Sequence, residues 1–172
     1  MSLKYFLKIL LFSGFLSIFN SCQPAQERST SLILIRHAEK ILASGNDPQL
    51  STKGWQRANE LVHIFDAVDI DAVYASPYRR AIDTARPLAT AKQLEILHYD
   101  PNELVSFAQE LLKTHQGETV VIVGHSNSTP QLTNTLAGTE YSDLEETEYD
   151  WLYFVEMSTF GTTKVKKLKV RL

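Results

Sequence analysis

The sequence predicts an α/β fold: a three-layer sandwich in which a mostly parallel central sheet carries helices on both faces and ends in a C-terminal antiparallel hairpin. Two observations predict it. Short apolar runs rich in β-branched residues alternate along the chain with amphipathic stretches of helical period. The chain then closes with two strand-like segments on either side of Gly161, which is the pattern of a hairpin.

The apolar runs predict buried strands. The runs 31–35 and 119–123 are almost wholly aliphatic, as is typical of parallel strands that helices cover on both faces. With the shorter runs and the hairpin, the predicted strands cover residues 31–35, 71–75, 94–97, 119–123, 151–157 and 162–170.

The amphipathic stretches predict four helices, at residues 51–67, 77–91, 100–117 and 128–137. Ser51 is the expected N-cap of the first. The third begins with Asp100-Pro101-Asn102-Glu103, where an aspartate cap, a proline at the first helical position and a glutamate three residues on are typical of a helix start.

Composition limits the possible functions. With 172 residues, of which 44% are hydrophobic and 22% charged, the chain is long enough for one packed domain, which we expect at residues 31–172. The net charge of −3 and the lack of a Lys/Arg block argue against nucleic acid as a partner. Cys22 is the single cysteine, which excludes an internal disulfide framework and a cysteine-rich zinc site. No metal-ligand spacing or nucleotide-binding glycine loop occurs, so neither a metal nor a cofactor is predicted.

The N-terminal segment predicts export. Residues 1–21 combine lysines at the start with a short apolar centre, as in a signal peptide, and the apolar centre is too short to span a bilayer. Cys22 follows directly, and the segment resembles a bacterial lipoprotein signal, which implies lipidation of Cys22 and a location in the cell envelope. Residues 22–30 would then be a polar tether, and the lipid would be the only membrane contact. The alternative is a plain secretory signal that is cut nearby, with Cys22 incidental.

Basic side chains and imidazoles follow three of the predicted strands. Arg36 and His37 come after the first, Arg80 after the second, and His125 after the fourth. Because ligands of such sheets bind outside the carboxyl ends of the strands, we expect these side chains to converge. Guanidinium groups bind phosphate oxygens in forked pairs, and a neutral imidazole can attack phosphorus. The arrangement favours phosphoryl transfer.

Four segments resemble motifs of the histidine phosphatase superfamily, in that family's order and spacing from about Leu32 to Ala137. They are Leu-Ile-Arg36-His37-Ala-Glu, Leu50-Ser-Thr-Lys-Gly54-Trp-Gln-Arg-Ala58, Ser76-Pro-Tyr-Arg-Arg80-Ala-Ile-Asp-Thr84-Ala and Val-Gly124-His125-Ser-Asn. The resemblance implies that His37 is the nucleophile and that Arg36, Arg80 and His125 hold the phosphate of a small phosphorylated substrate. Arg79 would face solvent or an acidic neighbour.

The chain departs from the family pattern at two points. Ala38 stands where the family usually has glycine, which is tolerable if the backbone there has a negative φ. Many members also carry an acidic proton donor after the second arginine motif. Glu103 is our preferred candidate, Asp100 is another, and solvent is the third; a capping role for Glu103 is the structural alternative.

The remaining histidines and the acidic run have structural interpretations. We expect His63, His98 and His115 to be structural or solvent-facing. The acidic run at 143–148 is interpreted as a solvated loop.

The predicted activity is hydrolysis of a phosphomonoester through a phosphohistidine on His37. A non-catalytic phosphate-binding module and a phosphomutase of the same fold are the alternatives. The four motif side chains argue against the first, and the expected export and short chain argue against the second. The identity of the ester and the oligomeric state are left open.

Overall fold

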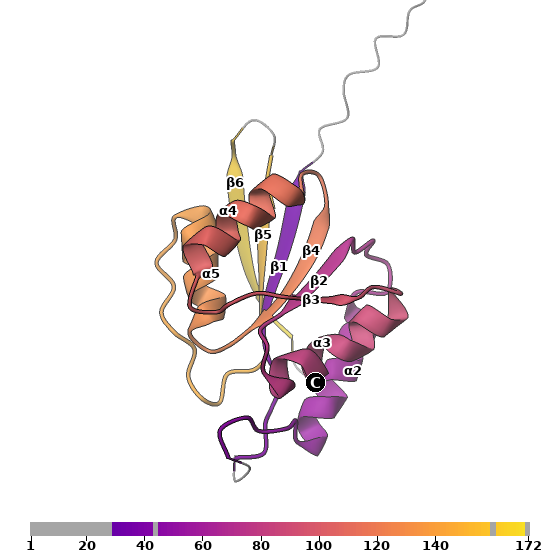
Figure 1. Ribbon diagram of the computed structural model, residues 1–172. Helices are drawn as coiled ribbons and strands as arrows, with labels where there is room; N and C mark the ends of the chain where they lie inside the picture. Colours follow the sequence, from indigo (N-terminus) through magenta and orange to yellow (C-terminus); the bar gives the residue numbers. More distant parts are fainter. Residues whose placement is uncertain (1–28, 43–44, 159–160, 171–172) are drawn as a thin grey trace, which may run out of the picture.

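Six strands form one sheet in the order β3-β2-β4-β1-β5-β6 (Figure 1). The computed structural model describes residues 29–42, 45–158 and 161–170. The strands are β1 (Thr30–Arg36), β2 (Ala72–Ala75), β3 (Ile96–His98), β4 (Thr119–Gly124), β5 (Trp151–Met157) and β6 (Thr163–Lys169). The first four are mutually parallel, and β5 and β6 form the antiparallel hairpin that the sequence predicts.

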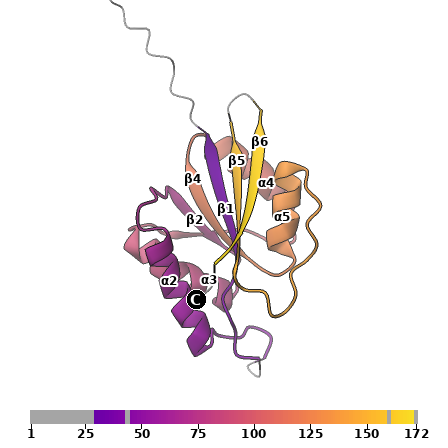
Figure 2. The same cartoon turned by 180° about the vertical axis from the view of Figure 1, so that it is seen from behind.

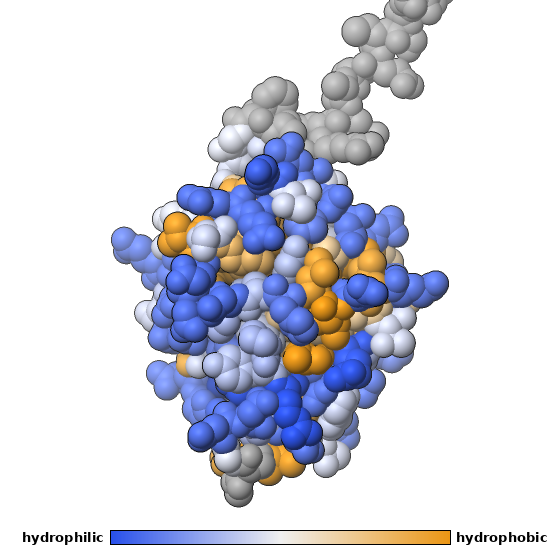
Figure 3. Space-filling view, in the orientation of Figure 1, coloured by the Kyte–Doolittle hydropathy of each residue, from blue (hydrophilic) through white to orange (hydrophobic). Residues whose placement is uncertain are grey.

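Two helices cover each face of the sheet (Figure 2). On one face lie α2 (Thr52–Ile64) and α3 (Arg79–Ala91), and on the other lie α4 (Leu104–Thr114) and α5 (Ser128–Ala137). The predicted three-layer sandwich is therefore confirmed. On the face of the molecule in Figure 3, hydrophobic residues form a group right of centre and several smaller spots among mainly hydrophilic residues.

The aliphatic strands supply the core of both layers. Side chains alternate across a strand, so Leu32 and Leu34 of β1 face α4 and α5, whereas Ile33 and Ile35 face α2 and α3. All four are at most 3% exposed. The strand β4 shows the same burial on both faces, as its composition predicts.

The start of α4 differs from the sequence prediction. The helix begins at Leu104 with Glu103 as its N-cap residue, and the Glu103 side chain makes no capping hydrogen bond. Asp100 caps a turn instead, because its Oδ1 accepts the backbone N–H of Asn102 at 2.9 Å. The predicted helix start at Asp100, and with it the capping role of Glu103, is wrong: the same residue types also build an isolated Asx turn.

Other boundaries shift by small amounts. The helix α2 ends at Ile64 rather than at residue 67, and β3 covers Ile96–His98 rather than 94–97. Ser51 caps α2 as predicted, since its hydroxyl accepts the N–H of Gly54.

The predicted signal at 1–21, Cys22 and most of the tether lie outside the described residues. Thr30 already belongs to β1 and is buried. Within the described ranges, no helix combines the length and the apolar character needed to cross a membrane.

Candidate active site

The register of the sheet aligns the carboxyl ends of β1, β2 and β4 with one another. Arg36 pairs with Gly124 across β1 and β4, and Ala75 pairs with Val123 across β2 and β4. Beyond these pairs the chains stay together, since the His37 N–H donates to the carbonyl of Gly124 at 2.9 Å. The residues after β1, β2 and β4 therefore meet at the carboxyl edge of the sheet, which is the lower edge in Figure 1.

His37 and His125 lie side by side at this edge. Their ring centroids are 5.4 Å apart, with an angle of 66° between the ring planes. The sequence places these residues 88 positions apart. The structure thus brings together the two imidazoles that the strand-exit argument predicts to converge.

The tautomer of His37 follows from one hydrogen bond. Its Nδ1 lies 2.8 Å from the carbonyl oxygen of Ala38, which can only accept, so Nδ1 carries the proton. The lone pair of a neutral ring is then on Nε2. Burial is the main cause that lowers the pKa of His37 to about 3; His125, Arg80 and Arg36 add to the lowering, and the hydrogen bond to the Ala38 carbonyl opposes it. His37 is therefore neutral and has a free nitrogen, as a nucleophile requires.

Thr84 fixes the backbone beside His37. Its hydroxyl accepts the N–H of Ala38 at 2.9 Å and donates to the carbonyl of Arg80 at 2.7 Å, and Thr84 is fully buried. In the described part of the chain, Gln93 is the only non-glycine residue with a positive φ. The backbone at Ala38 consequently imposes no need for glycine.

His125 is held at both ring nitrogens. Nε2 lies 2.8 Å from the Ser76 hydroxyl, and Nδ1 lies 3.2 Å from Nη2 of Arg80. Because a guanidinium only donates, Nδ1 accepts and the proton of a neutral ring is on Nε2. Burial lowers the pKa of His125 to about 4, and Arg80, Arg36 and Lys40 contribute. Without an anion the His125 ring is neutral, and its N–H points to Ser76.

The connection between α5 and β5 wraps around Arg36. The Nη1 atom donates to the carbonyls of Glu145 at 2.7 Å and Glu148 at 3.0 Å, and Nη2 donates to the Glu146 carboxylate at 3.0 Å. The ring of Tyr149 stacks on the guanidinium, 4.1 Å from its Cζ. The segment 143–148 is a loop whose acidic side chains are mostly exposed, as predicted, and its backbone in addition fixes a buried cation.

Arg80 is placed by a similar set of neighbours. Its guanidinium lies over the ring of Tyr78 at 4.7 Å, and its Nη1 is 3.6 Å from Oδ1 of Asp47. Tyr78 also contacts His125 edge-on, with centroids 5.0 Å apart. Arg79 is exposed and its backbone N–H donates to Asp47, in agreement with the prediction that Arg80 is the inward-facing arginine.

Three guanidinium nitrogens at this edge make no hydrogen bond, and one of them, Nη1 of Arg80, has only the 3.6 Å ion-pair contact with Asp47. Among the buried side-chain polar atoms of the described residues that make no hydrogen bond are Nε of Arg36 and both Nε and Nη1 of Arg80. A buried donor without an acceptor is costly, and most buried polar groups in proteins are paired. The donors therefore indicate a place where an anion binds.

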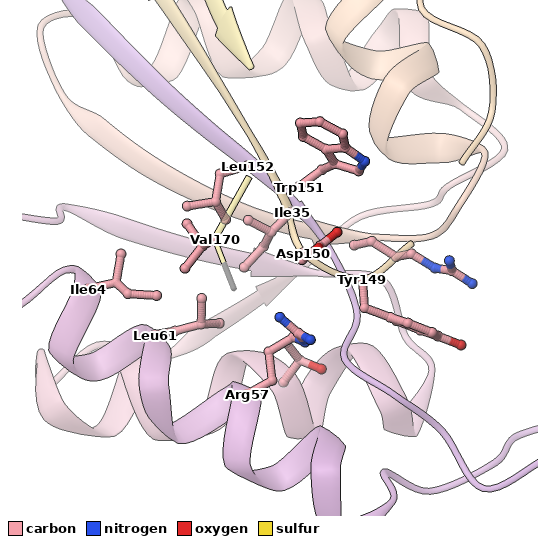
Figure 4. Close-up of a pocket in the computed structure, with 11 residues that line it drawn as sticks. Ile35, Arg57, Leu61, Ile64, Tyr149, Asp150, Trp151, Leu152 and Val170 are labelled. Atoms are coloured by element: carbon pink, nitrogen blue, oxygen red, sulfur yellow. The ribbon is translucent and has the colours of Figure 1, made fainter. Parts of the chain in front are cut away.

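Tyr149 lies against His37 as well as against Arg36. Its ring centroid is 6.0 Å from that of His37. Behind it, an apolar crevice separates α2 from the sheet, and Figure 4 shows Leu61 and Ile64 facing Leu152 and Val170. The crevice offers about 20 Å³, which is room for about one water molecule.

Glu103 lies apart from these contacts. It is exposed at the N-terminus of α4 and lines a surface depression together with Asn127, which follows the His125 turn. Asp100 is likewise exposed and is engaged by Asn102. Within the described residues, no group of three or more His, Cys, Asp or Glu side chains is arranged to hold a metal ion.

The other histidines lie away from the pair. His63 and His98 are exposed, and His98 bonds to the Ala75 carbonyl. His115 is buried between the hydroxyl of Tyr74 and the carboxylate of Glu118. These positions agree with their structural interpretation.

Sequence reasoning did not single out several residues of the site. Ser76 and Thr84 stand inside the quoted motif around Arg80, so the motif held the signal. Tyr78 stands there too. Tyr149 and the carbonyls around Arg36 follow no motif, and only the folded connection reveals them.

Comparisons with known proteins find similar sequences and a shared fold. Residues 32–103 match the sequence model of the histidine phosphatase superfamily (branch 1). A 75-residue segment is 36% identical to phosphoserine phosphatase 1 of Hydrogenobacter thermophilus, covering 40% of this chain. The match spans 36% of the length of that relative, about a third.

Solved structures share the fold at low identity. The protein histidine phosphatase SixA complexed with tungstate gives a TM-score of 0.67 at 17% identity, covering 81% of this chain and 96% of that one. Phosphoserine phosphatase from Entamoeba histolytica gives 0.58 at 18% identity, covering 83% and 98%. A putative α-ribazole-5′-P phosphatase from Escherichia coli gives 0.63 at 16% identity, covering 83% and 97%. Residues 32–103 thus resemble the histidine phosphatase superfamily in sequence, and the domain shares the fold of these solved phosphatase structures.

Proposed function

We propose that this protein is a phosphatase that hydrolyses a phosphomonoester through a phosphohistidine on His37. The observation that carries the proposal is the set of three buried guanidinium nitrogens of Arg36 and Arg80 that make no hydrogen bond, beside the free Nε2 of His37. A tetrahedral phosphoryl group supplies the oxygens that these donors lack.

Substrate binding places phosphorus in front of His37. Oxygens of the phosphoryl group accept from Nε of Arg36 and from Nε and Nη1 of Arg80. A bound dianion favours the charged form of a nearby imidazole, so His125 takes a proton on Nδ1 and donates to the anion in place of accepting from Arg80. The buried site excludes water and strengthens these interactions.

The chemistry proceeds in two displacements. Nε2 of His37 attacks phosphorus, the N–P bond forms and the bond to the ester oxygen breaks. The leaving oxygen takes a proton from Glu103, from Asp100 or from solvent, and both carboxyl groups are exposed. Water then attacks the phosphohistidine, which releases inorganic phosphate and restores neutral His37. Throughout, the Ala38 carbonyl holds the ring by its Nδ1–H.

The location follows from the N-terminal sequence. We propose that residues 1–21 are removed, that Cys22 is lipidated, and that the domain acts in the cell envelope on a small phosphorylated molecule. The lipid on Cys22 would be the attachment to the membrane.

The test compares single histidine variants on a generic aryl phosphate. His37→Ala is expected to lose at least about a thousandfold in kcat, because no other group replaces the nucleophile. His63→Ala removes an exposed histidine of α2 and is the matched control, with parental kcat expected. Circular dichroism and melting temperature show that both variants are folded. Parental turnover by folded His37→Ala would contradict the proposal.

A further inference from the structure

Glu146 bridges two cations at the mouth of the site. Its Oε2 accepts from Nη2 of Arg36 at 3.0 Å, and its Oε1 lies 2.9 Å from Nζ of Lys40. The Glu146 side chain is 56% exposed, whereas that of Arg36 is 1% exposed. A surface carboxylate therefore reaches a buried arginine that the proposed function assigns to phosphate.

The carboxylate takes one of the two donors that an anion would use. The Nε and Nη2 atoms of a guanidinium form a side-on fork that binds two oxygens of one anion. In Arg36, Nη2 is bonded to Glu146 and Nε has no partner. A phosphate that engages this fork therefore competes with the Glu146 carboxylate for the Nη2 atom.

Arg36 does not need Glu146 to keep its position. The carbonyls of Glu145 and Glu148 hold Nη1, and the ring of Tyr149 lies on the guanidinium plane. Loss of the carboxylate would therefore free a donor without releasing the side chain.

Lys40 offers the displaced carboxylate a second partner. Its ammonium already contacts the other oxygen of Glu146, and its side chain is 24% exposed. The carboxylate can leave Arg36 and remain paired with Lys40.

We propose that Glu146 is a residue that sets the affinity of the phosphate site, by competing with phosphate for Arg36 and withdrawing to Lys40 when phosphate binds. This inference rests on the proposed function. By returning to Arg36 after hydrolysis, the carboxylate would weaken the binding of the inorganic phosphate product and favour its release.

The experiment measures binding of inorganic phosphate by calorimetry and turnover of an aryl phosphate in the same proteins. Glu146→Gln keeps the shape and removes the charge, and it should tighten phosphate binding about three- to tenfold, with a matching fall in KM and kcat within about twofold. Glu140→Gln makes the same charge change at an exposed position and should leave the phosphate Kd unchanged.

The variant Lys40→Met distinguishes two roles of Lys40: holding the displaced Glu146 carboxylate, or binding the anion directly. In the parent background it should weaken phosphate binding about three- to tenfold, because the displaced carboxylate loses its second partner. Combined with Glu146→Gln it should have no effect. An equal loss in both backgrounds would show that Lys40 binds the anion itself and would overturn the proposal.

The other possible outcomes distinguish failure of this inference from failure of the proposed function. Unchanged or weaker phosphate binding by Glu146→Gln overturns the competition and indicates that the carboxylate only positions Arg36. If the parent binds and hydrolyses while Glu146→Gln behaves like the parent, this inference fails and the proposed function stands. If the parent protein neither binds phosphate nor hydrolyses the ester, both the proposed function and this inference are wrong.

Discussion

Replacing Thr84 with valine is expected to destabilise the protein and to impair the nucleophile. Valine has nearly the same shape, so the packing of this fully buried residue is kept and only the hydroxyl is lost. The Ala38 N–H then loses the acceptor that lies 2.9 Å away. The Arg80 carbonyl lies within α3 and keeps its helical partner.

The magnitude follows from the one donor left without a partner. A buried N–H that loses its acceptor costs about 1–3 kcal/mol in the free energy of unfolding. For a chain of 172 residues, a loss of about 2 kcal/mol lowers the melting temperature by roughly 4–8 °C. Because Ala38 also fixes the His37 ring, kcat/KM should fall about tenfold or more.

Thr133→Val is the matched control. Thr133 is also fully buried and helical, and its hydroxyl donates to the Thr129 carbonyl at 2.9 Å, as that of Thr84 does to Arg80. Within the described hydrogen bonds it accepts no backbone N–H, so its loss should cost less than about 0.5 kcal/mol. Thermal melts and aryl phosphate kinetics compare the two variants. Equal melting temperatures would refute the role assigned to the Ala38 bond.

Three further predictions concern charge and location. Since the folded pKa values of His37 and His125, about 3 and about 4, lie below the unfolded value near 6.5, stability should fall from pH 6.5 to 4.5 by about 1.4 kcal/mol per pH unit for each ring. The His37→Asn/His125→Asn double variant should lose this slope in pH-dependent melts, and an unchanged slope would assign it elsewhere. Inorganic phosphate should raise the melting temperature of the parent but not of Arg80→Gln, which lacks two of the unpartnered donors; equal shifts would remove Arg80 from the anion site. Cys22→Ser should move the protein from the membrane fraction to the soluble fraction, and continued membrane association would exclude lipidation as the anchor.

The layers and the edge that carries the site could be predicted because they depend on periodicity. The aliphatic runs around Ile33 and Val121 require burial on both faces, and parallel strands bring their carboxyl ends to one edge. That logic placed His37 beside His125.

The surroundings of Arg36 could not be predicted in the same way. Backbone carbonyls hold the guanidinium of Arg36. Because every residue has a carbonyl, no residue type in the segment 145–148 marks it as a partner of an arginine. The prediction of where α4 begins was wrong for another reason. Asp100 and Pro101 suit a helix N-terminus and a tight turn equally well, and the contact between Asp100 and Asn102 is local to the turn.

The trapping of the covalent intermediate tests the central claim most directly. After brief reaction with a ³²P-labelled phosphomonoester, the denatured parent should carry acid-labile, base-stable label, and peptide mapping should assign it to His37. The His37→Ala variant should carry none. Label on another residue, or acid-stable label on the parent, would contradict the assignment of His37 as the nucleophile.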